Sequence, residues 1–576
     1  MADVVVVGAG IGGLVAAHTL AARGLRVVVL EAAGRAGGPI RGGVFGSLPD
    51  VPLDLGAESF AVRGGVVEEL AKELGLTVEV PAKLSAWGYA AGRAFPLPAA
   101  GVLGIPSRPW GADVRRAIGW PGVLRGSLDR VLPSRFVDTT NLGTFARSRL
   151  GSRVTDRLVT PVAAGVHSAP LDRLDVAAVA PGLLDAYART GSLSRAVASL
   201  RAAAPPGSAV RGIDGGLHAL VNALVERLDV RLGTRVVGVE RAAATERVPH
   251  EVAAGDEEGA AGGDAGTANG DAGAASTETG AAGAGIAGAD RGNWLVRTEN
   301  GQVLRAPRLV LATRAEFGPL PVAGAEFGPL PAADAEIGRL SRDRSIKRPI
   351  SKQPTDVETK GVQRTEVAPA PSGEPAPSGE PVQLLPPPGE PAQPPAPSGE
   401  LAMPPAPERG ADIRLVTLLL EAPELDAAPR GSGMLVAPGT TSGAVRAKAL
   451  THATAKWPWL ARRVRDAVGP GWHVVRLSYG RIGEPTPEPT AEEAARDASA
   501  LLGVDLAGRV RDVLHQHWDG SLPPPTPAYR AAVKQFEEQV RTRPGLDVAG
   551  GWIAGTGLAA IIGHAQGTAE RLGTPG

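Results

Sequence analysis

The first residues of the chain that can do chemistry are four glycines and one acid. Gly8, Gly10 and Gly13 stand in the pattern G-x-G-x-x-G, and Gly12 lies beside the last of them. In this pattern the first glycine permits a tight turn, the second lets a phosphate approach the backbone, and the third brings a helix against a strand. Glu31 follows about 20 residues later, where a carboxylate can accept hydrogen bonds from ribose hydroxyls. The spacing predicts a dinucleotide site.

The elements that must position these residues follow from the same stretch. Residues 4–7 are all valine and residues 27–30 are again apolar, so both predict buried strands. The residues between them predict a helix whose N-terminal amides face the phosphates with partial positive charge. The acid at the end of the second strand argues against a 2′-phosphate, which leaves NAD and FAD as alternatives.

Composition excludes several classes of site. Lysine plus arginine and aspartate plus glutamate number 60 each, so no net field favours nucleic acid or an anionic membrane. A chain without cysteine has no disulfide, catalytic thiolate or iron–sulfur cluster. The nine histidines show no ligand spacing of the H-E-x-x-H kind, so we expect no metal.

The sequence predicts no targeting segment and no membrane-spanning segment. The first apolar run is too short for a signal peptide and no basic region precedes it. The glycine-rich apolar stretch 548–565 predicts a strand, a turn and a helix. We therefore expect no transmembrane segment and a cytoplasmic location.

Two segments differ in composition from the rest. Residues 241–291 are mainly alanine, glycine and acids, and residues 315–411 include repeats of P-A-P-S-G-E. Neither segment can bury enough apolar surface to offset the entropy of ordering it. We expect both to be disordered inserts.

The residues after Glu31 carry a first resemblance. The stretch "EAAGRAGGPIRGG", residues 31–43, adds a glycine pair and two arginines where a nicotinamide enzyme normally begins its next helix. This is similar to the long-form pattern of amine oxidases, phytoene desaturases and porphyrinogen oxidases. In those flavoproteins a C-terminal glycine turn closes over the flavin, and "GTGLAAIIGHAQGTAERL", from residue 555, is similar to that turn. The resemblance implies FAD.

A second resemblance is narrower. The stretch "LDLGAESFAVRGGVVEELAKELGL", residues 53–76, resembles the protoporphyrinogen oxidase and coproporphyrinogen III oxidase family of haem biosynthesis. Later stretches are similar in order and spacing, among them "RLVTPVAAGVHSAPLDRLDV", "GIDGGLHALVNAL", "KALTHATAKWPWLA" and "VVRLSYGRIGE".

Carried over position by position, the resemblance implies FAD contacts along most of the chain. They are Gly8, Ala9, Gly10, Ile11, Gly12, Gly13, Glu31, Ala32, Gly38, Arg41, Gly56, Ala57, Glu58, Ser59, Val236, Trp518, Gly555, Thr556, Gly557 and Leu558. For Trp518 a core tryptophan is the alternative, and for Arg41 a surface or pyrophosphate-facing arginine. No catalytic acid or base is implied, because the pyrrole protons can leave to solvent or to a propionate.

Three positions depart from the family pattern. Pro39 replaces a lysine, arginine or tryptophan, so a side-chain contact to FAD is lost there. The stretch "PPPTPAYRAAV" replaces the family motif after the tryptophan. Ala86 stands about where animal and plant relatives have a substrate-binding arginine, which fits a different substrate or clamp.

The implied fold is α/β, or α+β overall, in which a Rossmann-like FAD-binding domain alternates with a substrate domain of mixed sheet and helices. The predicted FAD-binding parts are 1–84, 211–314 and 496–576, and the predicted substrate parts are 85–210 and 412–495. The two disordered inserts interrupt this plan.

The implied function is a six-electron oxidation of coproporphyrinogen III to coproporphyrin III by FAD and dioxygen, with three hydrogen peroxides formed. The implied partners are the porphyrinogen, dioxygen and, transiently, the next enzyme of the haem pathway, and no nucleic acid. Protoporphyrinogen IX is the alternative substrate. Two further alternatives are an amine oxidase or carotenoid desaturase, and a non-enzymatic binding protein like the GDP-dissociation inhibitors.

Overall fold

The computed structural model describes most of the chain. The described residues are 2–62, 64–98, 101–133, 137–203, 210–242, 292–314, 401, 403–439, 445–484, 486–521, 523–524 and 526–573. The predicted disorder of the inserts 241–291 and 315–411 lies almost wholly outside them. At the insert edges, Arg241 ends one strand and Ala411 begins another.

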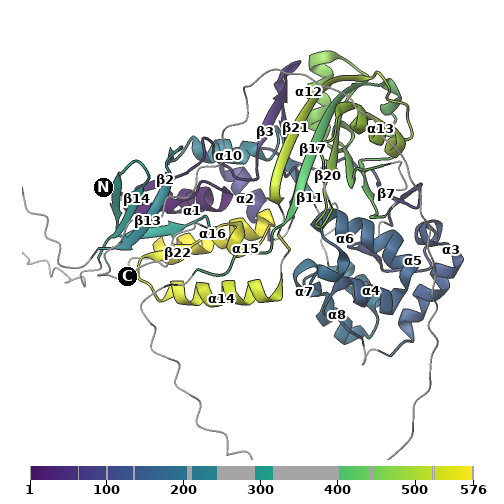
Figure 1. Cartoon of the computed structure of the whole chain (residues 1–576), viewed down its shortest axis with the longest axis horizontal. Coiled ribbons are helices and arrows are strands. Elements are labelled where there is room, and N and C mark those ends of the chain that lie inside the picture. The colour runs from purple at the N-terminus through teal and green to yellow at the C-terminus, as the bar shows by residue number, and fades with distance from the viewer. Residues whose placement is uncertain are drawn as a thin grey trace, which may run out of the picture. The chain divides into compact units, whose positions relative to one another are not determined.

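A five-stranded parallel sheet carries the glycine-rich turn (Figure 1). Its order is β12-β2-β1-β16-β22, with every neighbouring pair parallel. The central strand is four valines, all buried, as expected of a strand covered on both faces. The bounds are β1 Val4–Val7, β2 Val27–Leu30, β12 Asp229–Arg231, β16 Arg308–Leu311 and β22 Leu546–Val548. With α1 at Ile11–Ala21, the strand, helix and strand predicted over residues 4–30 are confirmed.

Different layers cover the two faces of this sheet. Val4 and Val6 point into a core shared with α1, α2, α10 and α16, and Val5 and Val7 point into a core shared with α14 and a small antiparallel sheet. The helices are α2 Val66–Glu73, α10 His218–Val225, α14 Pro527–Arg541 and α16 Leu558–Gly573. The small sheet is β13 Val236–Arg241, β14 Trp294–Thr298 and β15 Val303–Ala306.

A seven-stranded mixed sheet forms the second layer system, in the order β21-β17-β20-β19-β18-β7-β8. All its pairs are antiparallel except β18 with β7. Its strands are β7 Ala86–Ala90, β8 Arg93–Pro96, β17 Ala411–Glu421, β18 Gly433–Val436, β19 Ala449–His452, β20 Trp472–Tyr479 and β21 Val510–Ser521. One face packs on α13 (Ala491–Leu502) and the other on α12 (Pro458–Val468).

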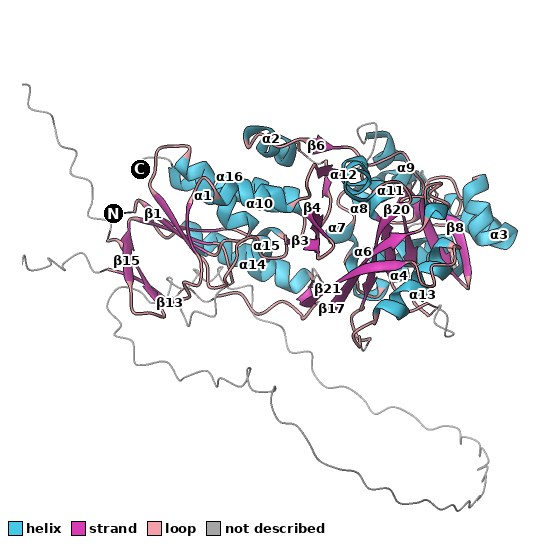
Figure 2. Cartoon of the chain, turned by 90° about the horizontal axis from the view of Figure 1, so that it is seen from above, coloured by secondary structure: helices cyan, strands magenta, loops and turns pink. Residues whose placement is uncertain are grey.

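A cluster of helices lies beside this sheet (Figure 2). It consists of α3 Ala112–Ser127, α4 Leu142–Leu150, α5 Ser152–Val154, α6 Thr160–His167, α7 Val176–Val179, α8 Leu183–Thr190 and α9 Leu193–Ala203. These helices share one core with Ala90 and Phe95 of the sheet and with Ala437, which follows β18. The arrangement confirms the predicted α/β class, with a mixed sheet and helices beside the parallel sheet.

Short elements connect the layers. They are β3 Gly42–Phe45, β4 Leu48–Asp54, β5 Phe60–Ala61, β6 Val78–Glu79, β9 Gly101–Val102, β10 Ile105–Pro106, β11 Val210–Ile213, α11 Ala453–Lys456, α15 Gly551–Ala554, and the helical turns η1 Leu128–Arg130, η2 Thr155–Val159, η3 Leu171–Arg173 and η4 Pro423–Leu425.

Two predicted ranges can be placed on this plan. The boundary at residue 496 does not follow the layers, because it lies within α13, which packs on the seven-stranded sheet, and β21 is a strand of that sheet as far as Ser521. Composition does not mark the point where the chain returns to the parallel sheet. The stretch 548–565 contains the end of β22, α15 and the first half of α16. Among the described residues, no helix is both long enough and apolar enough to cross a bilayer.

Candidate functional site

The glycines of the first turn have two different environments. A Cβ on Gly13 would lie 2.0 Å from the Gly8 carbonyl oxygen, and a Cβ on Gly12 would lie 2.6 Å from Gly550 Cα. Gly8 itself has φ of +105°, which an L-residue rarely adopts. These three glycines therefore let α1 pack tightly on β1 and on the turn before α15.

Gly10 instead faces open space. No heavy atom lies within 4 Å of the position that its Cβ would occupy. It is the N-cap of α1, no side chain caps the helix, and the first turn holds no acid. Uncapped amides at a helix start bind anions, and a side chain at residue 10 would fill the space above them. The turn therefore fits the pyrophosphate of a dinucleotide.

Glu31 lies at the end of β2, beside this turn. Its Oε2 accepts a hydrogen bond from Ala9 N at 2.8 Å, and its Oε1 accepts one from Ala33 N at 2.9 Å. Its backbone bonds with Arg231 and Thr234, just before β13 begins at Val236. The predicted ribose and adenine positions, including the exposed Ala32, are therefore neighbours.

The second glycine pair lies against the first turn. Gly37 N donates to Ala9 O at 2.8 Å, and the Cβ position of Gly38 lies 3.9 Å from Gly10 Cα. Arg41 is exposed, and its carbonyl oxygen accepts from Leu55 N at 2.8 Å. Residues 37–41 thus join the glycine turn to the stretch 55–59.

Trp518 reaches this stretch from the other sheet. Its Nε1 donates to Leu55 O at 2.9 Å, and a Cβ on Gly56 would lie 3.3 Å from its ring and 2.3 Å from Pro39 O. The Arg35 guanidinium lies 5.9 Å from the centre of the same ring. Trp518 is half-buried and attached to the predicted site, although it is 463 residues from Leu55.

The C-terminal glycine turn completes the group. Gly555, Thr556 and Gly557 are exposed and lead into α16 at Leu558, with open space beyond the Cβ positions of both glycines. One turn later, the Ile561 side chain lies 3.1 Å from the Cβ position of Gly12. The starts of α1 and α16 are therefore close together.

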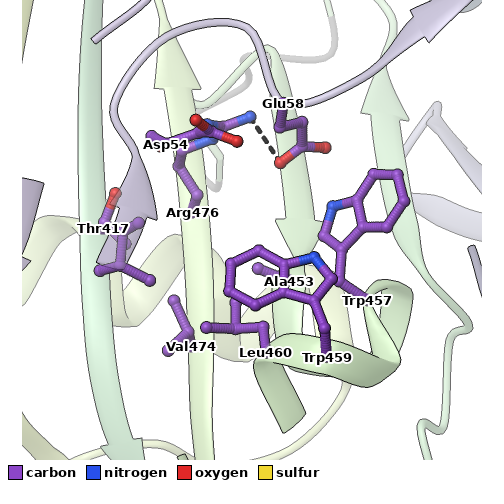
Figure 3. Close-up of a pocket in the computed structure, with 10 residues that line it drawn as sticks. Asp54, Glu58, Thr417, Ala453, Trp457, Trp459, Leu460, Val474 and Arg476 are labelled. Atoms are coloured by element: carbon purple, nitrogen blue, oxygen red, sulfur yellow. Dashed lines mark hydrogen bonds and ion pairs between the residues drawn. The ribbon is translucent and has the colours of Figure 1, made fainter. Parts of the chain in front are cut away.

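Glu58 has a different role from its neighbours. Its carboxylate accepts from Lys456 Nζ at 2.6 Å. It also pairs with Arg476 Nη2 at 2.8 Å, as Figure 3 shows. Burial raises the pKa of this carboxyl, but the charges of Arg476 and Lys456 outweigh it and lower the pKa to about 2. Glu58 therefore stays ionised and ties residues 54–59 to the seven-stranded sheet, between the exposed Ala57 and the half-buried Ser59.

Arg476 strengthens the same tie through the backbone. Its Nη1 donates to Asp54 O at 2.9 Å and to Gly56 O at 3.1 Å. Asp54 in turn accepts from Leu217 N and lies 2.9 Å from His218 Nδ1. Sequence reasoning missed Lys456 and Arg476, although both lie in stretches that carry the family resemblance. Only their pairing with Glu58, about 400 residues away, identifies them.

A small recess lies below this ion pair. Figure 3 shows Trp457, Trp459, Leu460 and Val474 under the charged groups of Glu58 and Arg476. Its remaining lining residues are Leu53, Asp54, Thr417 and Ala453. The recess has charged groups at its rim and apolar side chains below, at the junction of β4 with β20 and α12.

Comparison with known proteins finds partial matches in sequence. The model of the flavin-containing amine oxidoreductase family matches residues 11–265. A coproporphyrinogen III oxidase of Propionibacterium freudenreichii subsp. freudenreichii is 31% identical over 263 residues, which are 39% of this chain and 49% of the relative. The protein of the same name from Mycobacterium tuberculosis is 32% identical over 258 residues, which are 41% of this chain and 53% of the relative. The matches thus span about half the length of these relatives.

A solved structure extends the likeness of the fold. A protein from Exiguobacterium sp. 255-15, described as a candidate protoporphyrinogen oxidase, superposes with a TM-score of 0.61 at 17% identity. The superposition covers 99% of this chain and 98% of that chain. At this identity the likeness supports the architecture alone.

Proposed function

Because this chain is a relative of the flavin-containing amine oxidoreductases and of the coproporphyrinogen III oxidases, we propose that it is an FAD-dependent oxidase of coproporphyrinogen III. It is an oxidoreductase of the porphyrin pathway with FAD as its cofactor. One observation carries the cofactor assignment: stretches far apart in sequence meet around the open space at Gly10. The specific substrate rests on the curated relatives, and the proposed location is the cytoplasm.

In the proposed complex the glycine turn and the start of α1 would hold the pyrophosphate, and Glu31 would hold the ribose. Val236 would lie beside the adenine, and Trp518 and residues 56–59 would hold the remainder of the cofactor. FAD, when bound, accepts two electrons at a time and passes them to dioxygen. The ion pairs of Glu58 keep residues 54–59 in position, because both cations come from the seven-stranded sheet side.

The reaction balances over three turnovers. Coproporphyrinogen III loses six electrons and six protons, and three dioxygen molecules take them up as three hydrogen peroxides. We assign no side chain to proton abstraction, because the pyrrole protons can leave to solvent or to a propionate. The protein must orient a bridge carbon of the tetrapyrrole toward the cofactor and keep water away from it.

The test uses the purified full chain. We expect a flavin absorption spectrum, and with coproporphyrinogen III a rise in porphyrin fluorescence together with three peroxides per porphyrin. Protoporphyrinogen IX is measured in parallel, and the Gly10→Val variant is the control for oxidation without the enzyme. Bound flavin with neither porphyrinogen oxidised would contradict the proposal. Faster oxidation of protoporphyrinogen IX would show that protoporphyrinogen IX, and not coproporphyrinogen III, is the substrate. A chain that binds no flavin would be a non-enzymatic relative.

A further inference from the structure

Two buried cations lie where the seven-stranded sheet meets the helix cluster. Lys448 directly precedes β19 and Arg481 follows β20, and they are only 4% and 8% exposed. Lys448 Nζ donates to the hydroxyl of Ser168, the residue that ends α6 (Figure 1). Ile482, next to Arg481, donates its backbone N–H to the carbonyl oxygen of Ser168 at 2.9 Å. We call Lys448 and Arg481 the cation pair.

The cation pair is incompletely neutralised. Within the described residues, Lys448 Nζ contacts the Ser168 hydroxyl and forms no ion pair. Burial and then the charge of Arg481 lower the pKa of Lys448 to about 7, and Glu484 opposes them. The Nε of Arg481 is buried without a hydrogen-bond partner in the described part of the chain. A buried cation without a full partner costs free energy, so packing alone does not explain this pair.

Glu484 is a weakly held counter-charge. Its Oε2 lies 3.4 Å from Arg481 Nη1, which is long for a charge-assisted hydrogen bond, and its side chain is 50% exposed. The Nη2 of the same arginine donates to Val436 O at 2.9 Å and fixes the guanidinium. Glu484 can therefore turn out into water while Arg481 stays, which leaves Nη1 to a carboxylate that arrives from solvent.

An apolar cluster links the cation pair to the candidate cofactor site. Buried residues of β17, among them Ile413 and Leu415, form a small core on which both Trp518 and Ile482 pack. Trp518 belongs to the candidate site, and Ile482 directly follows the arginine of the cation pair. The two sites thus border the same apolar cluster. A ligand with an apolar body and a carboxylate at its edge matches this arrangement.

We propose that the cation pair binds a propionate carboxylate of the porphyrinogen, an inference that rests on the proposed function. The arriving carboxylate would displace Glu484 from Arg481 and supply the counter-charge that Lys448 lacks. The tetrapyrrole would lie toward Trp518, so the contact would help to orient a bridge carbon. Coproporphyrinogen III has a propionate on each of its four rings, so every edge that faces the pair presents a carboxylate. Protoporphyrinogen IX has propionates on two rings only.

The test measures binding of coproporphyrin III to the flavin-loaded full chain by the change in porphyrin fluorescence, so no turnover is needed. Lys448→Met and Arg481→Met should each weaken binding about tenfold or more, because a charge-assisted contact is lost. Glu484→Gln should instead strengthen binding several-fold, because it removes the competing carboxylate. Lys72→Met is the control, since this lysine of α2 is exposed, and it should bind like the unchanged chain.

Two further measurements separate binding from a structural role. Lys448→Met should raise the KM for coproporphyrinogen III about tenfold and leave kcat within about twofold, as expected for a contact made equally before and during the reaction. It should not lower the unfolding midpoint, because an apolar side chain replaces a buried charge without an ion-pair partner. A lysine that only caps the negative end of α6 would have the opposite signature, with a lower midpoint and unchanged binding. Flavin content shows that each variant is folded.

Three results would overturn the proposal. They are unchanged coproporphyrin III binding in both cation variants, weaker binding by Glu484→Gln, and displacement of the porphyrin by an equal concentration of sodium propionate. The last would assign the pair to a free carboxylate. Oxidation of coproporphyrinogen III with the same KM in all variants would contradict this inference alone. A flavin-loaded chain that binds coproporphyrin III through the pair but oxidises no porphyrinogen would contradict the proposed function alone.

Discussion

At the residue scale, Gly13 and Gly10 of the same turn have different roles, the first in packing and the second in leaving open space. At Gly13 the Gly8 carbonyl oxygen occupies the position that a Cβ would take, so no other residue fits there. At Gly10 the Cβ position is empty, so the protein itself leaves room for a side chain. Replacing Gly13 therefore damages packing, and replacing Gly10 blocks a ligand. The turn can be tested for ligand binding separately from folding.

We expect Gly10→Val to abolish flavin binding and leave folding intact. The valine side chain would fill the open space at the start of α1 without meeting a protein atom at its Cβ. Flavin content after purification and the far-ultraviolet circular dichroism spectrum report the two properties. Gly563→Ala is the matched control, because Gly563 in α16 also has nothing within 4 Å and should keep its flavin. Full flavin content in Gly10→Val would show that the pyrophosphate lies elsewhere.

Glu58 allows a test of its ion pairs through pH. Its pKa is lowered from 4.5 to about 2, so its stabilising effect is complete above pH 4.5 and is lost as the pH falls toward 2. We expect Glu58→Gln to cost about 3 kcal/mol of unfolding free energy at pH 7. The difference from the unchanged chain should shrink as the pH falls below 4.5, as measured by urea unfolding.

The control for this experiment is Glu488→Gln. Glu488 pairs with Arg414 at 2.6 Å but is 62% exposed, so its loss should cost less than about 1 kcal/mol. A difference between Glu58→Gln and the unchanged chain that stays constant from pH 7 to pH 3 would show that Glu58 acts by shape alone.

At the element scale, one buried ion pair holds the helix cluster together. Arg149 of α4 is 1% exposed. Its Nε donates a hydrogen bond to Asp129 Oδ1 of η1, at 2.7 Å. Asp129 also accepts from Ser192 Oγ, Leu193 N and Ser194 N at the start of α9. Burial raises the pKa of Asp129, but these hydrogen bonds outweigh it and lower the pKa. Three elements are thus joined through a single carboxylate.

We expect Asp129→Asn to destabilise the chain by about 3–5 kcal/mol, because the Arg149 charge would remain buried without its partner. The NH2 group of the asparagine amide would also face N–H and O–H donors that now hydrogen-bond to the carboxylate of Asp129. Chemical unfolding measures the loss. Asp172→Asn is the control in the same cluster, since its pair with Arg147 at 3.4 Å is exposed and should contribute less than about 1 kcal/mol. Equal effects of the two substitutions would contradict the role assigned to burial.

At the scale of the whole molecule, the candidate site is assembled from both ends of the chain. The turn at residues 8–13 meets the turn before α16. Residues 55–58 meet Trp518 and Arg476 of the seven-stranded sheet and Lys456 of α11. A cofactor bound at this site would therefore contact elements of both sheets.

We expect removal of flavin to lower the stability of both sheets together. A ligand that binds only the folded chain adds about 2.7 kcal/mol at a concentration 100 times its Kd. The urea midpoint should rise with added FAD, and tryptophan fluorescence and circular dichroism should report one coincident transition. Two separate transitions, with only one that depends on FAD, would show that the cofactor contacts a single sheet.

Local features of the sequence were enough to predict the first strand, helix and strand and the glycine turn between them. These features are the valine run at residues 4–7, the glycine spacing and Glu31. They lie close together in the chain, so their pattern can be recognised in the sequence. The α/β class and the use of FAD followed from resemblance over longer stretches. The predicted boundary at residue 496 does not follow the layers, because the sequence patterns of α13 and β21 do not show whether they pack with the parallel sheet or with the seven-stranded sheet.

Only the tertiary structure decided which distant residues meet. The ion pairs of Glu58 with Lys456 and Arg476 join residues about 400 positions apart, and no local pattern encodes such a contact. The sequence by itself determined the glycine turn at residues 8–13, since steric and dipole effects there are local. Packing determined the tie between the two sheets, since burial is a property of the folded chain.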